Sequence, residues 1–223
     1  MSSALFNYPQ QAAFNRPLPK SKIYAYAKPS RSIRERFVDE VDQIIWKYKL
    51  SPETINLSAT RSVPEIQIFE IVQRTEELSE YVVRTIDKAI SFPIFYELTF
   101  EGRLRVLAAY KRPSDADSAK WVVDSYFDSQ WCPVEAHRDP LPVALNLGSL
   151  YEQMLRRLIT IHARPGESLK SQIARISELR SKQLEQDKLE QRLNREKQFN
   201  RKVELNRELR RCKQEIDRLM DTQ

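Results

Sequence analysis

Acidic side chains in strand-like segments are the residues of this sequence most able to do chemistry. Glu65, Glu70 and Glu97 lie in stretches rich in β-branched and aromatic residues, which favour β-strands. Lys111, Asp124 and Asp128 lie in the strand-like stretches that follow. Carboxylates that converge across neighbouring strands can bind Mg²⁺ and activate water. Glu65, Glu70 and Glu97 therefore define one candidate catalytic site, that of a Mg²⁺-dependent nuclease with an atypical acidic centre.

Two observations weigh against this nuclease site. Metal-dependent restriction-type nucleases commonly place a lysine two residues after an Asp or Glu, and no such triplet occurs in the 223 residues. A half-covered sheet also turns every second side chain toward solvent, and this explains the same carboxylates without a metal. We favour the structural explanation and expect neither a catalytic residue nor a metal site.

Other reactive groups are sparse. His137 and His162 are the only imidazoles, and neither lies in a His-x-Glu or His-x-x-x-His frame. Cys132 with His137 is too small a set for zinc, and its surroundings fit a buried thiol better than a nucleophile. The three glycines stand too far apart to form a phosphate-binding loop: Gly102, Gly148 and Gly166. We therefore expect no cofactor, and an enzyme is the less favoured class.

We expect a globular protein of the cytoplasm. The chain is 41% hydrophobic and 30% charged, which provides enough apolar material for a core. It has no apolar stretch near the 18 to 20 residues that cross a bilayer and no signal-peptide pattern. Its two cysteines lie 80 positions apart and are expected to be reduced thiols.

The positive charge lies at the two ends of the chain. Residues 1–34 contain six basic and no acidic side chains, residues 35–166 have 16 basic and 20 acidic, and residues 167–223 have 15 basic and 11 acidic. Any phosphate binding should therefore belong to the ends. The candidate nucleic-acid contacts are Lys20, Lys22, Arg31 and Arg34.

The first 32 residues are expected to form a basic, proline-containing arm. Four prolines exclude a continuous helix, and aromatic residues alternate with the cations. Such an arm could stack its aromatics on bases while the cations contact phosphate. It could also lie along its own domain and bury the aromatics, which is the interpretation we favour.

Residues 33–163 are expected to form the folded body. The pattern predicts an α+β domain with a mostly antiparallel sheet of about four strands, covered on one face by flanking helices. Glu101-Gly102-Arg103 should form the turn of a hairpin, and Ser114 to Ser118 a polar turn. The expected strands are 54–58, 65–73, 94–100, 104–111 and 121–127, of which the first is short, and the expected helices are 33–48, 77–90 and about 145–159.

Residues 167–223 have the composition of one long helix, without proline or glycine. Five apolar residues step along it at spacings of 4, 3, 4 and 3, which is a coiled-coil seam: Leu205, Leu209, Cys212, Ile216 and Leu219. The seam needs a partner helix or must fold back on its own chain. We favour an intermolecular coiled coil, and hence a homo-oligomer or docking to another subunit.

Two stretches, 37–57 and 63–69, support a resemblance to a known family. They read FVDEVDQIIWKYKLSPETINL and VPEIQIF. This sequence resembles a bacterial family of domains of unknown function. Its members are typically encoded beside SNF2-type or type III restriction-like helicases and DNA methyltransferases, in phage-defence or restriction–modification loci.

The resemblance implies a small accessory subunit of a DNA-acting system, and it brings no active-site residues with it. Lys49, Thr54 and Asn56 lie in a polar segment where a loop could present them, although Thr54 and Asn56 could instead cap and turn the chain. We expect a non-catalytic interaction subunit. It would assemble through its C-terminal coiled coil with itself or with a helicase or methyltransferase, with DNA as a possible further partner.

Overall fold

The structure is a computed structural model that describes residues 4–114, 116–117 and 121–221. The expected polar turn at 114–118 lies partly outside the described residues. The chain divides into two compact units, Met1–Ile159 and Thr160–Gln223, and each is described by itself.

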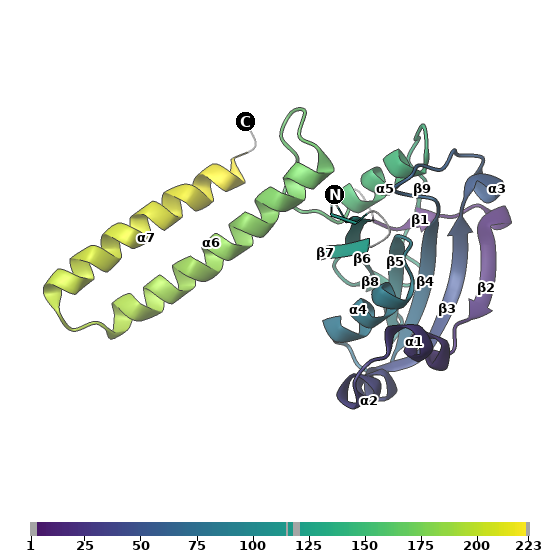
Figure 1. Cartoon of the computed structure of the whole chain (residues 1–223), viewed down its shortest axis with the longest axis horizontal. Coiled ribbons are helices and arrows are strands. Elements are labelled where there is room, and N and C mark those ends of the chain that lie inside the picture. The colour runs from purple at the N-terminus through teal and green to yellow at the C-terminus, as the bar shows by residue number, and fades with distance from the viewer. Residues whose placement is uncertain (1–3, 115, 118–120, 222–223) are drawn as a thin grey trace. The chain divides into compact units, whose positions relative to one another are not determined.

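The first unit is built on a mixed sheet (Figure 1). In order across the sheet, its strands are β2 (Ala13–Pro17), β3 (Val41–Leu50), β4 (Ile66–Gln73), β5 (Ile94–Phe100), β6 (Arg103–Pro113) and β7 (Trp121–Asp128), and β8 (Cys132–Pro133) pairs with β6. All neighbours run antiparallel except β4 and β5, which are parallel. The α+β class is confirmed, but the described residues form a seven-stranded sheet rather than one of about four strands.

The helix predicted for 33–48 is wrong in its second half. Helix α2 (Arg31–Glu40) ends where Val41 takes up an extended backbone, and β3 begins at once. The spacing of Ile44, Ile45 and Tyr48 suits a helix, but β-branched and aromatic side chains also suit a strand. Pairing with β2 on one edge and β4 on the other decides for the strand.

The strand predicted for 54–58 is also wrong. Residues 52–55 form a short helix, α3 (Pro52–Ile55), which follows a capping box at Ser51 and has proline at its start. In contrast, the hairpin between β5 and β6 is as predicted. Glu101 and Gly102 have φ values of 47° and 74°, and two consecutive positive φ angles are typical of a tight hairpin turn.

Helices cover one face of the sheet, and a fourth helix lies on the other. Helices α1 (Lys20–Ala27), α2 and α4 (Glu80–Ala89) pack on the side chains of Phe69, Ile71, Tyr96 and Leu98. Neighbouring side chains of a strand point to opposite faces, and Phe95 makes an edge contact with Tyr151 of α5 (Leu147–Arg156) at 6.0 Å. Ile66, Gln67, Ile68 and Phe69 are all buried, so the sheet is covered on both faces and not on one.

The N-terminal residues fold onto this unit. Strand β1 (Phe6–Asn7) pairs in parallel with β9 (Asp139–Pro140), and a single 3-10 turn (Gln10–Ala12) leads into β2. Aromatic side chains fasten the segment: the ring centroids lie 4.8 Å apart for Tyr8 and Tyr48, 4.3 Å for Phe14 and Trp46, and 5.4 Å for Tyr24 and Phe37. Tyr8, Phe14 and Tyr24 thus pack along their own domain, as in the favoured interpretation, whereas Tyr26 of the same segment is exposed.

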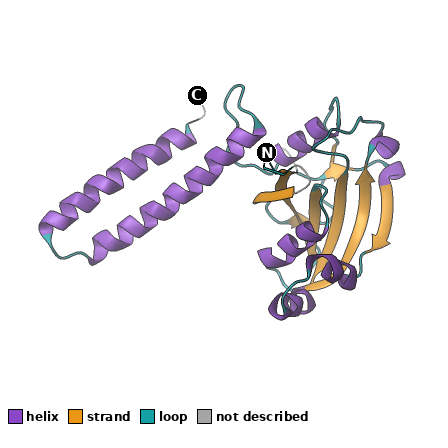
Figure 2. Cartoon of the chain, viewed as in Figure 1, coloured by secondary structure: helices purple, strands orange, loops and turns teal. Residues whose placement is uncertain are grey.

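The second unit is a helical hairpin rather than one continuous helix. Helix α6 (Leu169–Arg195) and helix α7 (Phe199–Met220) lie side by side and run in opposite directions (Figure 2). The chain reverses through extended residues at Glu196 and Gln198. The free energy gained by burying the apolar seam of α7 against α6 offsets the cost of the helical hydrogen bonds lost at this break. Among the helices described, none is both long and apolar enough to span a membrane.

Candidate functional site

Each of the three candidate catalytic carboxylates is held by its own cation. Glu97 binds Arg138 through both oxygens, with N···O distances of 2.6 Å and 3.0 Å. Glu70 pairs with Lys47 at 3.1 Å, and Glu65 pairs with Lys49 at 3.2 Å. The negative charge that would attract a metal ion is therefore already compensated at every position.

The carboxylates also do not converge on one point. Glu70 and Glu97 are partners on the parallel strands β4 and β5. Glu65 lies five residues before Glu70, which is about 16 Å along an extended chain and an odd step that turns it to the opposite face. In the part of the chain that the structure describes, no group of three or more His, Cys, Asp or Glu residues could hold a metal ion.

The Glu97–Arg138 pair fastens the N-terminal strand to the sheet. Glu97 is buried, and Arg138 also donates a hydrogen bond to the Phe6 carbonyl at 3.2 Å. The Asn7 side-chain amide donates to the Arg138 carbonyl at 2.9 Å. The hydrogen bond that Arg138 donates to Glu97 is the main cause that raises the pKa of Arg138. Burial, and next the charge of Glu97, raises the pKa of Tyr8. The role of this pair is structural.

A second buried ion pair joins α4 to the sheet. Lys111 Nζ lies 2.9 Å from Asp87 Oδ1, and both side chains are almost wholly excluded from solvent. The same ammonium donates to the carbonyls of Ile90 at 2.6 Å and Phe92 at 2.9 Å, and the Tyr126 hydroxyl donates to Asp87. Burial lowers the pKa of Lys111, an effect that the charge of Asp87 opposes. This cluster closes the end of α4.

The sequence interpretation missed the partners in this cluster, although a signal was present. Asp87 lies on the apolar face of its helix, and Lys111 follows Ala108 and Ala109 in an apolar strand. An acidic and a basic residue at two otherwise apolar positions indicate a buried ion pair, because an unpaired buried charge is strongly destabilising.

The three loop candidates have local structural roles. Lys49 binds Glu65, as described above. The Thr54 hydroxyl accepts a hydrogen bond from the Ser51 N–H at 2.9 Å and donates to the Lys49 carbonyl at 2.7 Å. Asn56 ends α3 in the left-handed conformation with φ 53°. Thr54 and Asn56 thus cap and turn the chain, as the alternative interpretation held.

The four candidate nucleic-acid contacts differ in whether their side chains already bind other groups of the chain. Lys20 Nζ donates to the Phe37 carbonyl at 2.7 Å and to the Val41 carbonyl, and burial lowers its pKa, so it caps the end of α2. Arg31 pairs with Glu35 on the surface, and the Arg34 guanidinium lies 5.3 Å from the centroid of the Tyr24 ring. Lys22 is exposed and, within the residues described, forms no ion pair.

The candidate oligomerisation residues are buried within their own chain. Leu205, Leu209, Cys212 and Ile216 of α7 pack with Leu179 and Leu189 of α6, and Leu219 packs at the edge of this cluster. Burial raises the pKa of the Cys212 thiol, which donates a hydrogen bond to the Lys182 carbonyl at 3.3 Å. The fold-back alternative therefore describes the chain, and the seam does not need a second copy.

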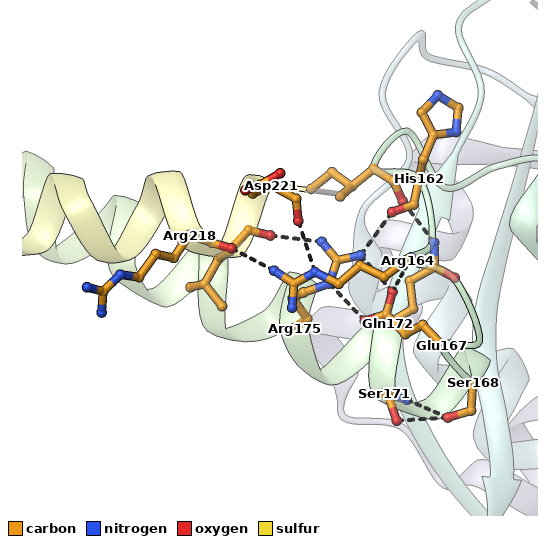
Figure 3. A network of polar contacts seen from close by, with 11 residues as sticks. His162, Arg164, Glu167, Ser168, Ser171, Gln172, Arg175, Arg218 and Asp221 are labelled. Atoms are coloured by element: carbon orange, nitrogen blue, oxygen red, sulfur yellow. Dashed lines mark hydrogen bonds and ion pairs between the residues drawn. The ribbon is translucent and has the colours of Figure 1, made fainter. Parts of the chain in front are cut away.

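A polar network closes the base of the hairpin (Figure 3). Arg175 binds both oxygens of Glu167 at 2.8 Å and donates to the carbonyls of His162 and Leu219. Arg164 donates to the carbonyls of Arg218 and Asp221 at 2.6 Å and 2.9 Å. Guanidinium groups thus satisfy the last carbonyls of α7, where the helix dipole is negative. This network, called the clasp below, was not predicted.

The fold and its charge clusters define an α+β protein with a helical hairpin, in which the buried pairs Glu97–Arg138 and Asp87–Lys111 join separate elements of the first unit. The chain belongs to the family described as a domain of unknown function, DUF4391, whose model matches residues 6–216. No curated protein and no solved structure is similar enough to match it.

Proposed function

We propose that this protein is a non-catalytic accessory subunit of a bacterial DNA-acting defence or restriction system. The gene neighbourhood implied by the family resemblance supports a helicase or methyltransferase as the partner. The chemistry supports a binding role, because the three sheet carboxylates are each matched to a cation that holds an element in place.

The observation that carries the DNA part of the proposal is a cationic surface on α1 and α2. We call it the α1–α2 surface and define it by Lys22, Lys28, Arg31 and Arg34 with the exposed ring of Tyr26, which is 79% accessible. Neither helix has an acidic residue in its first turn. Lys22 lies in the first turn of α1 and Arg31 in the first turn of α2, where a cation opposes the helix dipole. These cations raise the positive potential that attracts phosphate.

The hairpin is the proposed docking element for the protein partner. Its seam is filled by α6, so a partner would contact the outer faces and not the seam. Leu184 and Val203 are apolar side chains on those faces, 60% and 45% accessible. In this proposal the C-terminal helices still mediate assembly. The partner would bind the outer faces of the preformed hairpin instead of forming a two-chain coiled coil with the seam.

Co-purification tests the subunit role. The tagged full-length chain, expressed together with the genes beside its own, should recover a helicase or a DNA methyltransferase in a fixed ratio at 150 mM salt. Replacing both Leu184 and Val203 by Asp should reduce that recovery, whereas the matched change of exposed Glu178 and Asp187 to Gln should not. Recovery of the chain alone would contradict the proposed role.

Salt dependence tests the α1–α2 surface. Changing Lys22, Lys28 and Arg34 to Gln should make the log–log slope of DNA affinity against salt less steep by about 2.7. The matched control changes three exposed cations elsewhere on the same unit, Arg61, Lys88 and Arg157, to Gln. Equal slopes for the two variants would remove this surface from the proposal.

A further inference from the structure

We propose that the tip of the helical hairpin is a second nucleic-acid contact, which binds the backbone through its cations and stacks Phe199 on an unpaired base. The tip is defined as residues 192–202, where α6 ends and α7 begins. This inference rests on the proposed association with DNA and adds a surface that the expected basic arm did not include.

The tip is strongly positive for its size. Its eleven residues include five cations, Arg192, Arg195, Lys197, Arg201 and Lys202, and a single acid, Glu196. The two ends of the hairpin differ in how they use positive charge. At the base, Arg164 and Arg175 are occupied by carbonyls and by Glu167. At the tip, the cations face solvent.

Most tip cations form no ion pair with the residues that the structure describes. Arg201 pairs with Glu204 one turn along the helix. Among the residues that the structure describes, Arg192, Arg195, Lys197 and Lys202 form no ion pair. Glu196 instead accepts the backbone N–H groups of Lys197 and Gln198 at 2.8 Å and 2.9 Å, so its carboxylate holds the turn. Those hydrogen bonds lower its pKa.

Helix stabilisation explains only part of this charge. Arg192 and Arg195 lie in the last turn of α6, where cations favour the helix dipole. Lys197 and Lys202 lie around the start of α7, which has no acidic residue in its first turn. There the dipole is positive, so the helix dipole does not account for these two lysines.

An exposed aromatic ring lies among these cations. Phe199 is the first residue of α7 and is 78% accessible, while the seam residues of the same helix are buried. Solvent-exposed aromatic rings beside Arg and Lys are the combination that single-stranded nucleic acids use, because every base offers a stacking face and every nucleotide a phosphate.

The same residues fit nucleic acid better than a membrane or an acidic protein. Phe199 is the one exposed large apolar side chain described within 192–202, which is too little for interfacial insertion. Its neighbours Asn194, Gln198 and Asn200 carry amides, which can both donate to and accept from base edges. An acidic protein would satisfy the cations but would leave the ring and the amides without a matching group.

Fluorescence anisotropy with the full-length chain tests the inference. The probes are a labelled 30-nucleotide single strand, its duplex and, separately, vesicles rich in phosphatidylserine. Phe199→Ala should weaken single-strand binding about tenfold with an unchanged salt slope, and Phe199→Trp should restore it. Changing Arg195, Lys197 and Lys202 together to Gln should make the single-strand log–log salt slope less steep by about 2.1.

The matched control changes three cations nearer the base of the hairpin, Arg210, Arg211 and Arg218, to Gln, and helical content by circular dichroism checks the fold of each variant. If tip and control variants bind the single strand equally, or if tip variants lose only vesicle binding or only partner recovery, the inference is overturned. A loss confined to the α1–α2 variant would also overturn it while leaving the proposed function intact. A loss of single-strand affinity confined to the tip variants would support the inference. It would also remove the α1–α2 surface from the proposed function.

Discussion

Both terminal nitrogens of Arg138 bind the carboxylate of Glu97, at 2.6 Å and 3.0 Å, although the two residues lie 41 positions apart in the sequence. The strand residue is buried, and the arginine comes from the irregular segment that carries β9. Because Arg138 also holds the Phe6 carbonyl, one guanidinium joins three separate parts of the first unit.

Arg138→Ala should therefore destabilise the first unit by about 3 kcal/mol, because it leaves a buried carboxylate without its partner. Urea denaturation measures the change in the free energy of unfolding. The control is Asp42→Asn, which breaks an exposed pair with Arg74 and should change stability by less than about 1 kcal/mol. Equal effects of the two substitutions would show that the Arg138 pair adds nothing beyond surface electrostatics.

Lys111→Met should be among the most damaging single substitutions in the chain, with a loss of about 3 to 5 kcal/mol, because it leaves the buried Asp87 carboxyl without its partner. Adding Asp87→Leu to the same chain should recover most of that loss, since two apolar side chains need no partner. A double-mutant cycle by urea denaturation gives the coupling energy. A coupling near zero would contradict the ion pair.

The clasp should make the hairpin sensitive to acid. The hydrogen bond from Arg175 is the main cause that lowers the pKa of Glu167 from 4.5 to about 2. A group whose pKa is lower in the folded state stabilises that state above its unfolded pKa, so this stabilisation should be lost as the pH falls from about 4.5 to 2. Hydrogen exchange of the amides of α7 across this range measures it.

Glu167→Gln should remove this acid dependence, whereas Glu178→Gln, at an exposed position of α6, should retain it. An acid transition that is the same in both variants would mean that the clasp is not its origin.

The buried seam predicts a hairpin that is stable without a second copy. Leu205→Ala should destabilise it by about 2 to 5 kcal/mol through the cavity left between α6 and α7. The unfolding midpoint of the parent chain should not change with protein concentration, because the seam is buried between two helices of one chain. A midpoint that rises over a hundredfold increase in concentration would show that the seam is shared between chains.

Local chemistry allowed much of the first unit to be predicted. Strands β4 to β7, α4 and α5 lie within a few residues of their predicted positions, and the β5–β6 turn follows from Gly102 and its neighbours. Residues 41–50 were predicted wrongly because a run such as Ile44, Ile45, Trp46 satisfies both helical and extended packing. Only the strands on either side, far away in sequence, decide between the two.

The candidate sites were harder to predict for a related reason. The sequence shows where each carboxylate lies, but not which arginine or lysine pairs with it in the fold. Arg138, the partner of Glu97, lies in a segment without regular spacing. The reversal at Glu196 and Gln198 contains neither proline nor glycine, so nothing local separates α6 from α7. The packing of the α7 seam against α6 of the same chain depends on that reversal.

The attachment of β1 to β9 has a consequence for the order of events during synthesis. Phe6 leaves the ribosome early but accepts its hydrogen bond from a residue 132 positions later. The N-terminal strand must therefore wait, unpaired, until almost the whole first unit has emerged, and such long-range closure is intrinsically slow. The hairpin needs only neighbours in sequence, so it can form within moments of its own translation.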